Sequence, residues 1–302
     1  MGLTRRQLLA GLAAGATAAP AQFRPGNGPK IRTVPAICLY SQVLIKIGYD
    51  ELGPVLRSLG LDGCDLSVQP GGHVVPAQAP VDMMRSVEAI TGVGLDVPII
   101  TTAYTSLADP TARNVLAICG EMGVPLFRTG VWKYGAAEPE ARLAEVQRDI
   151  MGLASLSRAV NMGMTIPNVA GENVGAATWD LNAIIRGIDP RAVGYSFDPG
   201  YALEEGGVGG ASVALRLAGP KVKAVTVRDF TWARDGAGAW KPQPCPLGEG
   251  MVDWPRFFQT LARLKFVGPV TLPLDHHPQD ELGAIRRDAA FVRKQIGAAY
   301  GG

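Results

Sequence analysis

Residues 163–198 read GMTIPNVAGENVGAATWDLNAIIRGIDPRAVGYSFD. The short apolar runs at 163–167 and 192–198 are predicted strands, and residues 177–188 between them have the apolar spacing of a helix. A strand, helix and strand in this order imply a right-handed crossover between parallel strands. This stretch therefore predicts an α/β fold built on a parallel sheet.

The same unit recurs along the chain. Short apolar runs predict eight strands at Pro35–Tyr40, Gly63–Val68, Val97–Thr102, Leu126–Val131, Gly163–Pro167, Ala192–Asp198, Val222–Asp229 and Pro269–Leu274. An open dinucleotide-binding sheet would carry a glycine-rich phosphate turn after its first strand, but residues 39–43 contain no glycine. We therefore expect residues 35–302 to form one domain, a closed (β/α)₈ TIM barrel.

The first 21 residues have the features of an export signal. Arg5 and Arg6 precede a short apolar stretch rich in glycine and alanine, and small residues follow up to Ala21. This pattern is typical of a twin-arginine signal peptide cleaved near Ala21, followed by a linker over residues 22–34. It predicts a periplasmic or secreted protein that meets the export machinery; an uncleaved anchor or an interfacial helix is the alternative reading. No later segment is apolar for long enough to predict a membrane span.

Charge and cysteine content narrow the function classes. The chain has 29 Lys and Arg against 27 Asp and Glu, and the counts become equal without Arg5 and Arg6. A neutral mature chain with no basic run gives no reason to expect nucleic-acid binding. Cys38, Cys64, Cys119 and Cys245 lack the spacing of a metal finger. Folding in the cytoplasm before export favours buried free thiols over two disulfides.

In a TIM barrel the active site lies where strands end and the following loops begin. Polar residues that follow the predicted strands are therefore the candidates. We expect catalytic groups among His73, Asp198, Arg228, Asp229, Asp275 and His276, and substrate-binding groups among Trp132, Asn168, Tyr201, Trp232 and Glu249. A rim of aromatic rings, amides and carboxylates suits a small carbohydrate, because sugars stack their apolar faces and pair their hydroxyls.

Several of these residues also have a structural reading. Asp198 could cap the turn at Gly200, and His73 could stabilise the loop that contains Gly71 and Gly72. Arg228 and Asp229 could brace neighbouring loops, and Glu249 could cap backbone amides between its two glycines.

Four short motifs resemble a known family. They are GLDGCDLS at 60–67, FDPGYA at 197–202, VRDF at 227–230 and PLGEGMVDW at 246–254. Together they resemble the sugar phosphate isomerase/epimerase family with a xylose isomerase-like TIM barrel. The resemblance extends over nearly all of the mature chain, and it is most specific from residue 246 to residue 270.

The resemblance implies a divalent metal held by a Glu after strand 5, an Asp after strand 6, a His on strand 7 and a Glu after strand 8. In this sequence Asp198 matches the strand 6 Asp, and Asp275 falls where the last Glu is expected. Asn168 or its neighbours replace the first Glu, and Thr226 falls where the His is expected. Asp198 and Asp275 are thus the metal-ligand candidates, and the sequence leaves open both a site with Mg²⁺ or Mn²⁺ and a site without metal.

Two functions follow from these features. The first is an exported sugar isomerase or epimerase that transfers a proton beside a carbonyl, with or without a divalent metal. The second is a periplasmic carbohydrate-binding or accessory protein without activity, built on a barrel that has lost part of the family metal site. An apurinic-site endonuclease on the same architecture is disfavoured, because the chain has only three histidines and no basic groove is expected from its charge.

Overall fold

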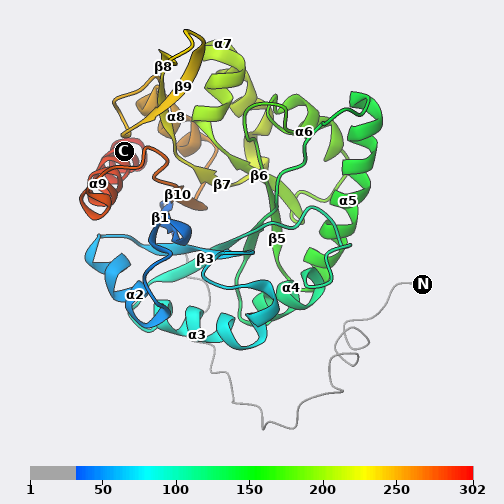
Figure 1. Ribbon diagram of the computed structural model, residues 1–302, viewed down its shortest axis with the longest axis vertical. Coiled ribbons are helices and arrows are strands. Elements are labelled where there is room, and N and C mark those ends of the chain that lie inside the picture. Colours follow the sequence, from blue (N-terminus) through cyan, green and yellow to red (C-terminus); the bar gives the residue numbers. More distant parts are fainter. Residues whose placement is uncertain (1–31, 302) are drawn as a thin grey trace.

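Eight parallel strands close into a barrel in the computed structural model, which describes residues 32–301 (Figure 1). The order around the barrel is β1-β10-β7-β6-β5-β4-β3-β2. The bounds are β1 (Ala36–Tyr40), β2 (Gly63–Val68), β3 (Asp96–Thr102), β4 (Leu126–Arg128), β5 (Gly163–Pro167), β6 (Val193–Phe197), β7 (Val222–Thr226) and β10 (Pro269–Leu272). Pairing of Ile37 with Val270 closes the ring between its first and last strands. The predicted TIM barrel is confirmed.

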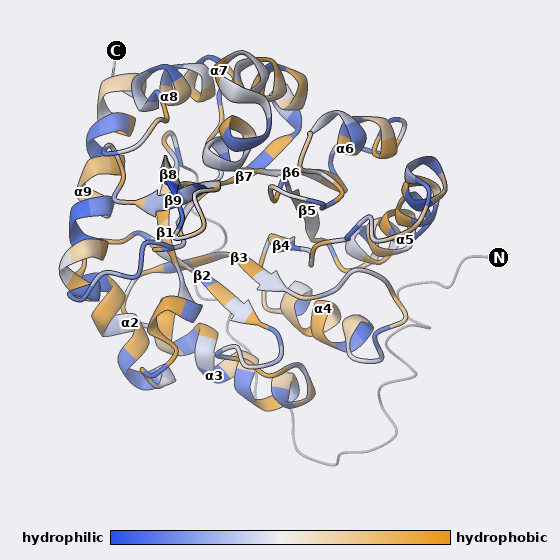
Figure 2. Ribbon diagram, turned by 45° about the horizontal axis from the view of Figure 1, so that its top comes forward, coloured by the Kyte–Doolittle hydropathy of each residue, from blue (hydrophilic) through white to orange (hydrophobic). Residues whose placement is uncertain are grey.

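Helices surround the strands on the outside (Figure 1). They are α2 (Tyr49–Ser58), α3 (Ala79–Thr91), α4 (Ala112–Glu121), α5 (Pro139–Ala159), α6 (Trp179–Ile184), α7 (Pro199–Ala218), α8 (Trp254–Arg263) and α9 (Glu281–Tyr300). Figure 2 shows hydrophobic and hydrophilic residues interleaved along these outer helices, as expected where one helix face packs on the barrel.

Helix α8 shows how the local sequence fixes an outer helix. The Asp253 carboxylate accepts a hydrogen bond from the amide of Arg256 and caps the first turn. Trp254, Phe257, Phe258 and Leu261 recur at helical spacing and are all buried. The apolar face therefore points to the barrel, and the cap sets where the helix begins.

Two elements differ from the sequence-based prediction. The seventh predicted strand, Val222–Asp229, is split: β7 ends at Thr226, and Asp229 begins β8 (Asp229–Arg234), which pairs antiparallel with β9 (Trp240–Cys245). Helix α7 also begins at Pro199, whereas the apolar spacing of the sequence predicts a helix only over residues 211–217. Glycines in residues 206–210 hide the helix in the sequence, and Gly207 kinks it with φ 58°.

Some sequence-based expectations concern the termini and the thiols. The predicted signal peptide, residues 1–21, and most of the predicted linker lie outside the described residues. All four cysteines are unpaired; Cys38, Cys64 and Cys119 are buried, whereas Cys245 is partly exposed.

Of the helices within residues 32–301, none has the length and apolar character needed to cross a bilayer.

Candidate functional site

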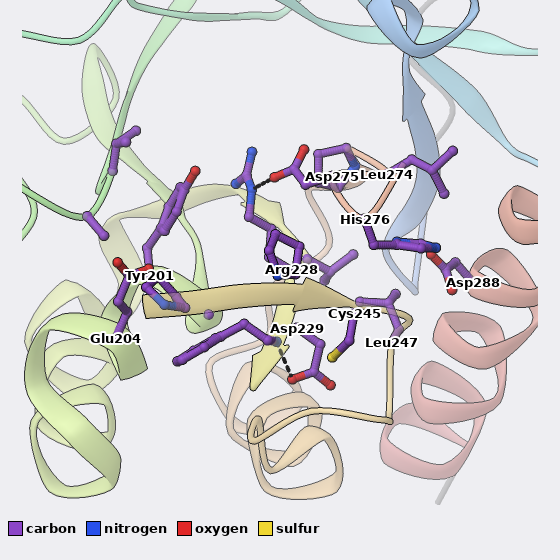
Figure 3. A pocket seen from close by; sticks show the side chains of 18 residues that line it. Tyr201, Glu204, Arg228, Asp229, Cys245, Leu247, Leu274, Asp275, His276 and Asp288 are labelled. Carbon is purple, nitrogen blue, oxygen red and sulfur yellow. Dashed lines mark hydrogen bonds and ion pairs between the residues drawn. The ribbon is translucent and has the colours of Figure 1, made fainter. Parts of the chain in front are cut away.

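Arg228 is the centre of the candidate site at the carboxyl ends of the strands. It follows β7, and its guanidinium lies between two carboxylates from neighbouring strand ends. Nη1 donates to Oδ2 of Asp198 after β6. Nε donates to Oδ2 of Asp275 after β10, the contact that Figure 3 shows. The guanidinium also lies 4.5 Å from the ring centroid of Tyr201, a cation–π distance. The barrel thus brings together four predicted residues from three strand ends.

Backbone contacts hold Asp198 in place. Its Oδ1 accepts a hydrogen bond from the Tyr201 amide 3.1 Å away, which caps helix α7. The side-chain amide of Asn168 bonds both backbone groups of Asp198, at 2.7 Å and 3.0 Å. Asn168 therefore ties the end of β5 to the end of β6 and is itself buried. The structural cap suggested by the sequence and the contact with Arg228 are both present at Asp198.

Burial and the neighbouring charges shift the pKa values of this ion-paired cluster in opposite directions. Burial raises the pKa of Asp198, and the Arg228 guanidinium opposes that rise. Burial alone would lower the pKa of Arg228, but Asp198 and Asp275 outweigh it and raise that pKa above its ordinary value. Arg228 is thus a permanent cation at the barrel mouth. The Asp275 side chain is 34% exposed and the Asp198 side chain only 3%, so solvent reaches the site on the Asp275 side.

A cavity of about 450 Å³ opens above the strand ends beside Arg228. Hydroxyl groups, one amide and two arginines supply most of its polar lining; these residues are Tyr40, Gln69, Thr101, Thr102, Thr105, Arg128, Thr129, Ser196, Thr226, Arg228 and Thr271. Gln69 donates to the Tyr40 hydroxyl at 2.9 Å, and burial raises the pKa of Tyr40 to about 12, so this hydroxyl stays protonated. The cavity is of a size and polarity suited to a small polyhydroxy ligand.

The lower wall of this cavity is a second arginine cluster. Arg128 Nη1 lies 2.6 Å from Oδ2 of the fully buried Asp65 and 2.5 Å from the Thr101 hydroxyl. Arg128 Nε lies 2.9 Å from the Ser196 hydroxyl, and Nη2 lies 3.4 Å from that of Thr271. Each guanidinium nitrogen of Arg128 therefore has a partner inside the barrel.

A smaller cavity of about 220 Å³ lies on the other side of Arg228, against the β8–β9 hairpin (Figure 3). Asp275 and His276 reach it from the segment after β10, and Asp288 reaches it from α9. The His276 imidazole points toward Asp288 in Figure 3. Burial raises the pKa of Asp288 to about 6 and lowers that of His276. Leu274, which precedes Asp275 and His276, has φ 54°. This backbone angle is unfavourable for a bulky residue, and it indicates that the surrounding structure holds the segment in place.

Asp229 lines this smaller cavity, but its carboxylate is used by the neighbouring loop. It accepts hydrogen bonds from the amides of Gly248 and Val252 at 2.9 Å and 3.2 Å. It also accepts one from Trp254 Nε1 at 2.8 Å. A Cβ at Gly250 would lie 2.1 Å from the same carboxylate, so only glycine fits there. Asp229 was predicted among the catalytic residues, but these contacts give it the loop-bracing role that was the alternative.

Other predicted residues lie apart from the mouth. His73 is buried in the loop after β2, where Nε2 lies 3.1 Å from the carbonyl of Ile47, and it lines neither mouth cavity. Trp132 is buried, with its indole 3.4 Å from the Asp149 carboxylate. Trp232 stands exposed on β8 against Phe230, and Glu249 lies exposed on the loop held by Asp229. Of the predicted set, Asp198, Tyr201, Arg228, Asp275 and His276 therefore meet at the mouth, with Asn168 behind them.

The residues present do not fit the divalent metal that the family resemblance implies. A guanidinium already lies between Asp198 and Asp275, the two candidate ligands, and would have to leave before both could bind a cation. The side-chain oxygen and nitrogen of Asn168 both bond the backbone of Asp198, and Thr226 has no imidazole to offer. Within residues 32–301 no group of three His, Cys, Asp or Glu side chains is placed to hold a metal ion. Arg228 is the cation of this site.

Sequence analysis missed Arg128, Tyr40 and Asp288. Arg128 sits inside the predicted strand Leu126–Val131, whereas β4 ends at Arg128 itself and directs it into the barrel. The signal was an arginine within a predicted strand, because a charged side chain buried there needs a partner. No feature of the sequence points to Asp288 as a site residue. It lies on helix α9, away from any strand end in the sequence, and only the tertiary fold brings it beside the mouth.

Comparisons with known proteins agree with the fold. A family model described as "Xylose isomerase-like TIM barrel" matches residues 55–295. A solved xylose isomerase-like TIM barrel protein from Mycobacterium smegmatis, in complex with magnesium, is 16% identical with a TM-score of 0.68, covering 88% of this chain and 97% of that one. The 3-keto-D-glucoside 4-epimerase YcjR from E. coli is 14% identical with a TM-score of 0.67, covering 86% and 99%.

An L-ribulose 3-epimerase is 16% identical with a TM-score of 0.67, and the match covers 88% of this chain and 96% of the epimerase. Identities this low show a shared fold. No curated protein matches the chain.

Proposed function

Because the chain belongs to the xylose isomerase-like TIM barrel family, we propose that it is a sugar isomerase/epimerase-like enzyme that works at the Arg228 site without a divalent metal. Solved proteins with this fold include an L-ribulose 3-epimerase and a 3-keto-D-glucoside 4-epimerase, which act on small sugars. The observation that carries the proposal is the Arg228 guanidinium, which is held between Asp198 and Asp275 beside a cavity lined by several hydroxyl groups.

The cavity is suited to bind sugar hydroxyls. Threonine, serine and tyrosine hydroxyls both donate and accept hydrogen bonds, and Gln69 offers an amide. The two carboxylates and the Asp65–Arg128 pair leave no excess positive charge for a phosphate or another strong anion. We therefore assign an uncharged carbohydrate as the substrate class.

Arg228 and Asp275 supply the groups for proton transfer beside a carbonyl. The base takes a proton from the carbon next to the carbonyl, and the electron pair of that C–H bond moves to the carbonyl oxygen. Arg228 Nη2, which has no hydrogen bond to any described residue, donates to the negative oxygen so formed. The partly exposed carboxylate of Asp275 takes this proton. In isomerisation it returns the proton to the neighbouring carbon while the proton of the adjacent hydroxyl moves to the former carbonyl oxygen. In epimerisation the same carbon is protonated from the opposite face by water, and Asp275 releases its proton to solvent. Asp198 holds the guanidinium in position through Nη1.

Export is part of the same proposal. The twin-arginine pattern at residues 1–21 supports a periplasmic or secreted enzyme that folds before it crosses the membrane. Replacement of Arg5 and Arg6 by lysine should retain the protein in the cytoplasm, which fractionation would detect. Unchanged export of this variant would contradict the twin-arginine route.

Solvent exchange tests the activity directly. A panel of ketoses, aldoses and keto-glycosides incubated with the enzyme in D₂O should yield one sugar that gains deuterium at the carbon beside its carbonyl, as followed by NMR. Asp275→Asn should lose this exchange. A sugar that is converted by wild type without deuterium uptake, or converted equally by Asp275→Asn, would contradict the proposed roles.

A second function is favoured by one observation. Arg228 is ion-paired with both carboxylates, as expected of a cluster that only holds the strand ends together. A carbohydrate-binding protein without turnover would keep this arrangement. Calorimetric binding of a sugar with no deuterium exchange and no interconversion would favour this second function.

A further inference from the structure

A cavity of about 520 Å³ lies between helices α7 and α8 on the outside of the barrel (Figure 2). It shares no lining residue with the two cavities at the mouth. The residues of α7 that line it recur at helical spacing; they are Val208, Ala211, Ser212, Leu215 and Arg216. Arg256, Thr260 and Arg263 recur in the same way on α8. Residues three and four apart share one side of a helix, so one side of each helix faces the cavity.

The floor of this cavity is apolar. Phe197 on β6, Leu215 on α7 and Phe257 on α8 line it, and they are 1%, 6% and 6% exposed. Val208 and Met251 also line it, but they are 64% and 48% exposed. Large apolar side chains left exposed beside an apolar cavity form a surface that a ligand would cover.

The rim of the cavity is basic. Arg216 on α7 and both Arg256 and Arg263 on α8 line it and are exposed. Arg256 Nη2 donates to the Ser212 hydroxyl at 3.3 Å, and Arg263 Nη2 donates to the Thr260 hydroxyl at 2.9 Å. Within residues 32–301 none of these three arginines is ion-paired with a carboxylate.

This local charge is positive, although the whole chain has 29 Lys and Arg against 27 Asp and Glu. Three arginines line the cavity with one acidic residue, Asp253. The Asp253 carboxylate accepts a hydrogen bond from the amide of Arg256 at 3.1 Å, as the cap of α8. A guanidinium binds a carboxylate through two parallel hydrogen bonds. The rim therefore favours an anionic head group, and the floor favours an apolar tail.

We propose that the cavity between α7 and α8 binds a fatty acid, with its alkyl chain on the apolar floor and its carboxylate among Arg216, Arg256 and Arg263. A cavity of about 150 Å³ holds benzene, so a cavity more than three times as large has room for about 20 non-hydrogen atoms. A fatty acid of about 10 to 16 carbons is within that size. This site is separate from the Arg228 site and does not rest on the proposed function.

Other occupants fit this cavity less well. A helix of a partner protein is about 10–12 Å across with its side chains, so three turns fill more than about 1,000 Å³ and cannot enter. A second copy on a two-fold axis would bring the basic rim against itself. Residues 1–31 contain four Lys or Arg and no acidic residue, so they do not complement the rim either.

Calorimetry with single-chain amphiphiles tests the site. Dodecanoate, hexanoate and dodecyltrimethylammonium are titrated into the delipidated full chain, each below its critical micelle concentration. Dodecanoate should bind one to one and at least tenfold more tightly than either of the others. Hexanoate lacks half of the alkyl chain, and dodecyltrimethylammonium has the same chain with the opposite charge.

Two variants locate the binding. Arg256→Gln with Arg263→Gln removes two charges from the rim and should weaken dodecanoate binding at least tenfold. Arg113→Gln with Arg186→Gln is the matched control, because both arginines are exposed and neither lines the cavity. Ala211→Trp fills the cavity and should abolish binding; if it does not fold, the pair of exposed arginine substitutions decides the question.

Three results would overturn the site. They are no binding of dodecanoate, equal binding of dodecanoate and dodecyltrimethylammonium, and unchanged dodecanoate binding when both rim arginines are replaced. Sedimentation of the free chain tests the second-copy alternative. A dimer that Ala211→Trp dissociates would assign the cavity to a second copy and would also overturn the fatty-acid site.

Discussion

Arg128 and Arg228 both pair with carboxylates near the strand ends, yet their surroundings differ. Arg128 lies inside the barrel, faces one carboxylate and has hydroxyl partners for its remaining nitrogens. Arg228 lies at the mouth, faces two carboxylates and keeps Nη2 free of bonds to described residues. Its side chain is 23% exposed, whereas that of Arg128 is 9% exposed. Arginine and aspartate thus form a network with every guanidinium nitrogen bonded at Arg128, and a network with one unbonded nitrogen at Arg228.

The difference separates a structural role from a ligand-binding one. A buried network with all its groups bonded fixes the packing around it, and removal of one member leaves an uncompensated charge. A guanidinium with a free nitrogen beside a cavity can still bond a ligand. We therefore expect substitutions at Arg128 to act mainly on stability, and those at Arg228 mainly on sugar binding and turnover.

The largest effect should come from Arg128→Met. It leaves Asp65 buried without its cation, and we expect a loss of about 3–5 kcal/mol in the free energy of unfolding. Urea denaturation followed by circular dichroism measures it. The double variant Arg128→Met with Asp65→Leu should recover part of the loss, because no lone buried charge remains. A single variant as stable as wild type would break the contrast between the two arginines.

Arg228→Lys should have the next largest effect, this time on turnover. Lysine keeps the positive charge but cannot hold two carboxylates and a substrate oxygen with one planar group. We expect kcat to fall about 10²-fold to 10³-fold, the range for loss of an oxyanion donor. The free energy of unfolding should change by only about 1 kcal/mol. A variant with full activity on the sugar would remove Arg228 from the site.

Asp275→Asn tests whether the exposed side of the mouth also acts on turnover and not on stability. We expect kcat to fall about 10²-fold, since an amide cannot accept the proton. Stability should change by less than about 1 kcal/mol, because the carboxylate is partly exposed. Asp235→Asn is the control: it breaks the exposed pair with Lys241 on the hairpin and should leave kcat unchanged. Equal kcat values for the two variants would contradict the role of Asp275.

The raised pKa of Asp288 predicts that the free energy of unfolding depends on pH. Its pKa rises from an ordinary value of 3.8 to about 6 on folding, so the folded protein holds this proton more tightly than the unfolded chain. The stability it contributes is present below about pH 4 and is lost as the pH rises through about 6. Asp288→Asn should therefore gain about 1–2 kcal/mol on wild type at pH 8 compared with pH 4.

Urea unfolding at both pH values checks this difference. Glu281→Gln, exposed on the same helix, is the control and should change the free energy of unfolding little at either pH. The same difference between the two pH values in both variants would show that Asp288 is not the source.

Much of the fold could be predicted from the sequence, since short apolar runs alternate with helical spacing. The rule that active sites lie at the carboxyl ends of barrel strands also predicts Asp198 and Asp275 at one rim. The double contact of Arg228 was not predicted, because the chain turns out of the barrel after Thr226 and the sequence gives no sign of where that turn falls. His73 was misplaced for a similar reason: its glycine-rich turn folds back on residues 47–49 instead of over the mouth.

The central claim is that Arg228 supplies the positive charge of this site in place of a metal. The most direct test is deuterium exchange into the sugar substrate by wild type and Arg228→Lys after exhaustive dialysis against a chelator, with metal content measured on the same samples. We predict full exchange by metal-free wild type and a loss of at least 10²-fold in the variant. Loss of exchange from wild type on chelation, restored by Mg²⁺ or Mn²⁺, would contradict the account.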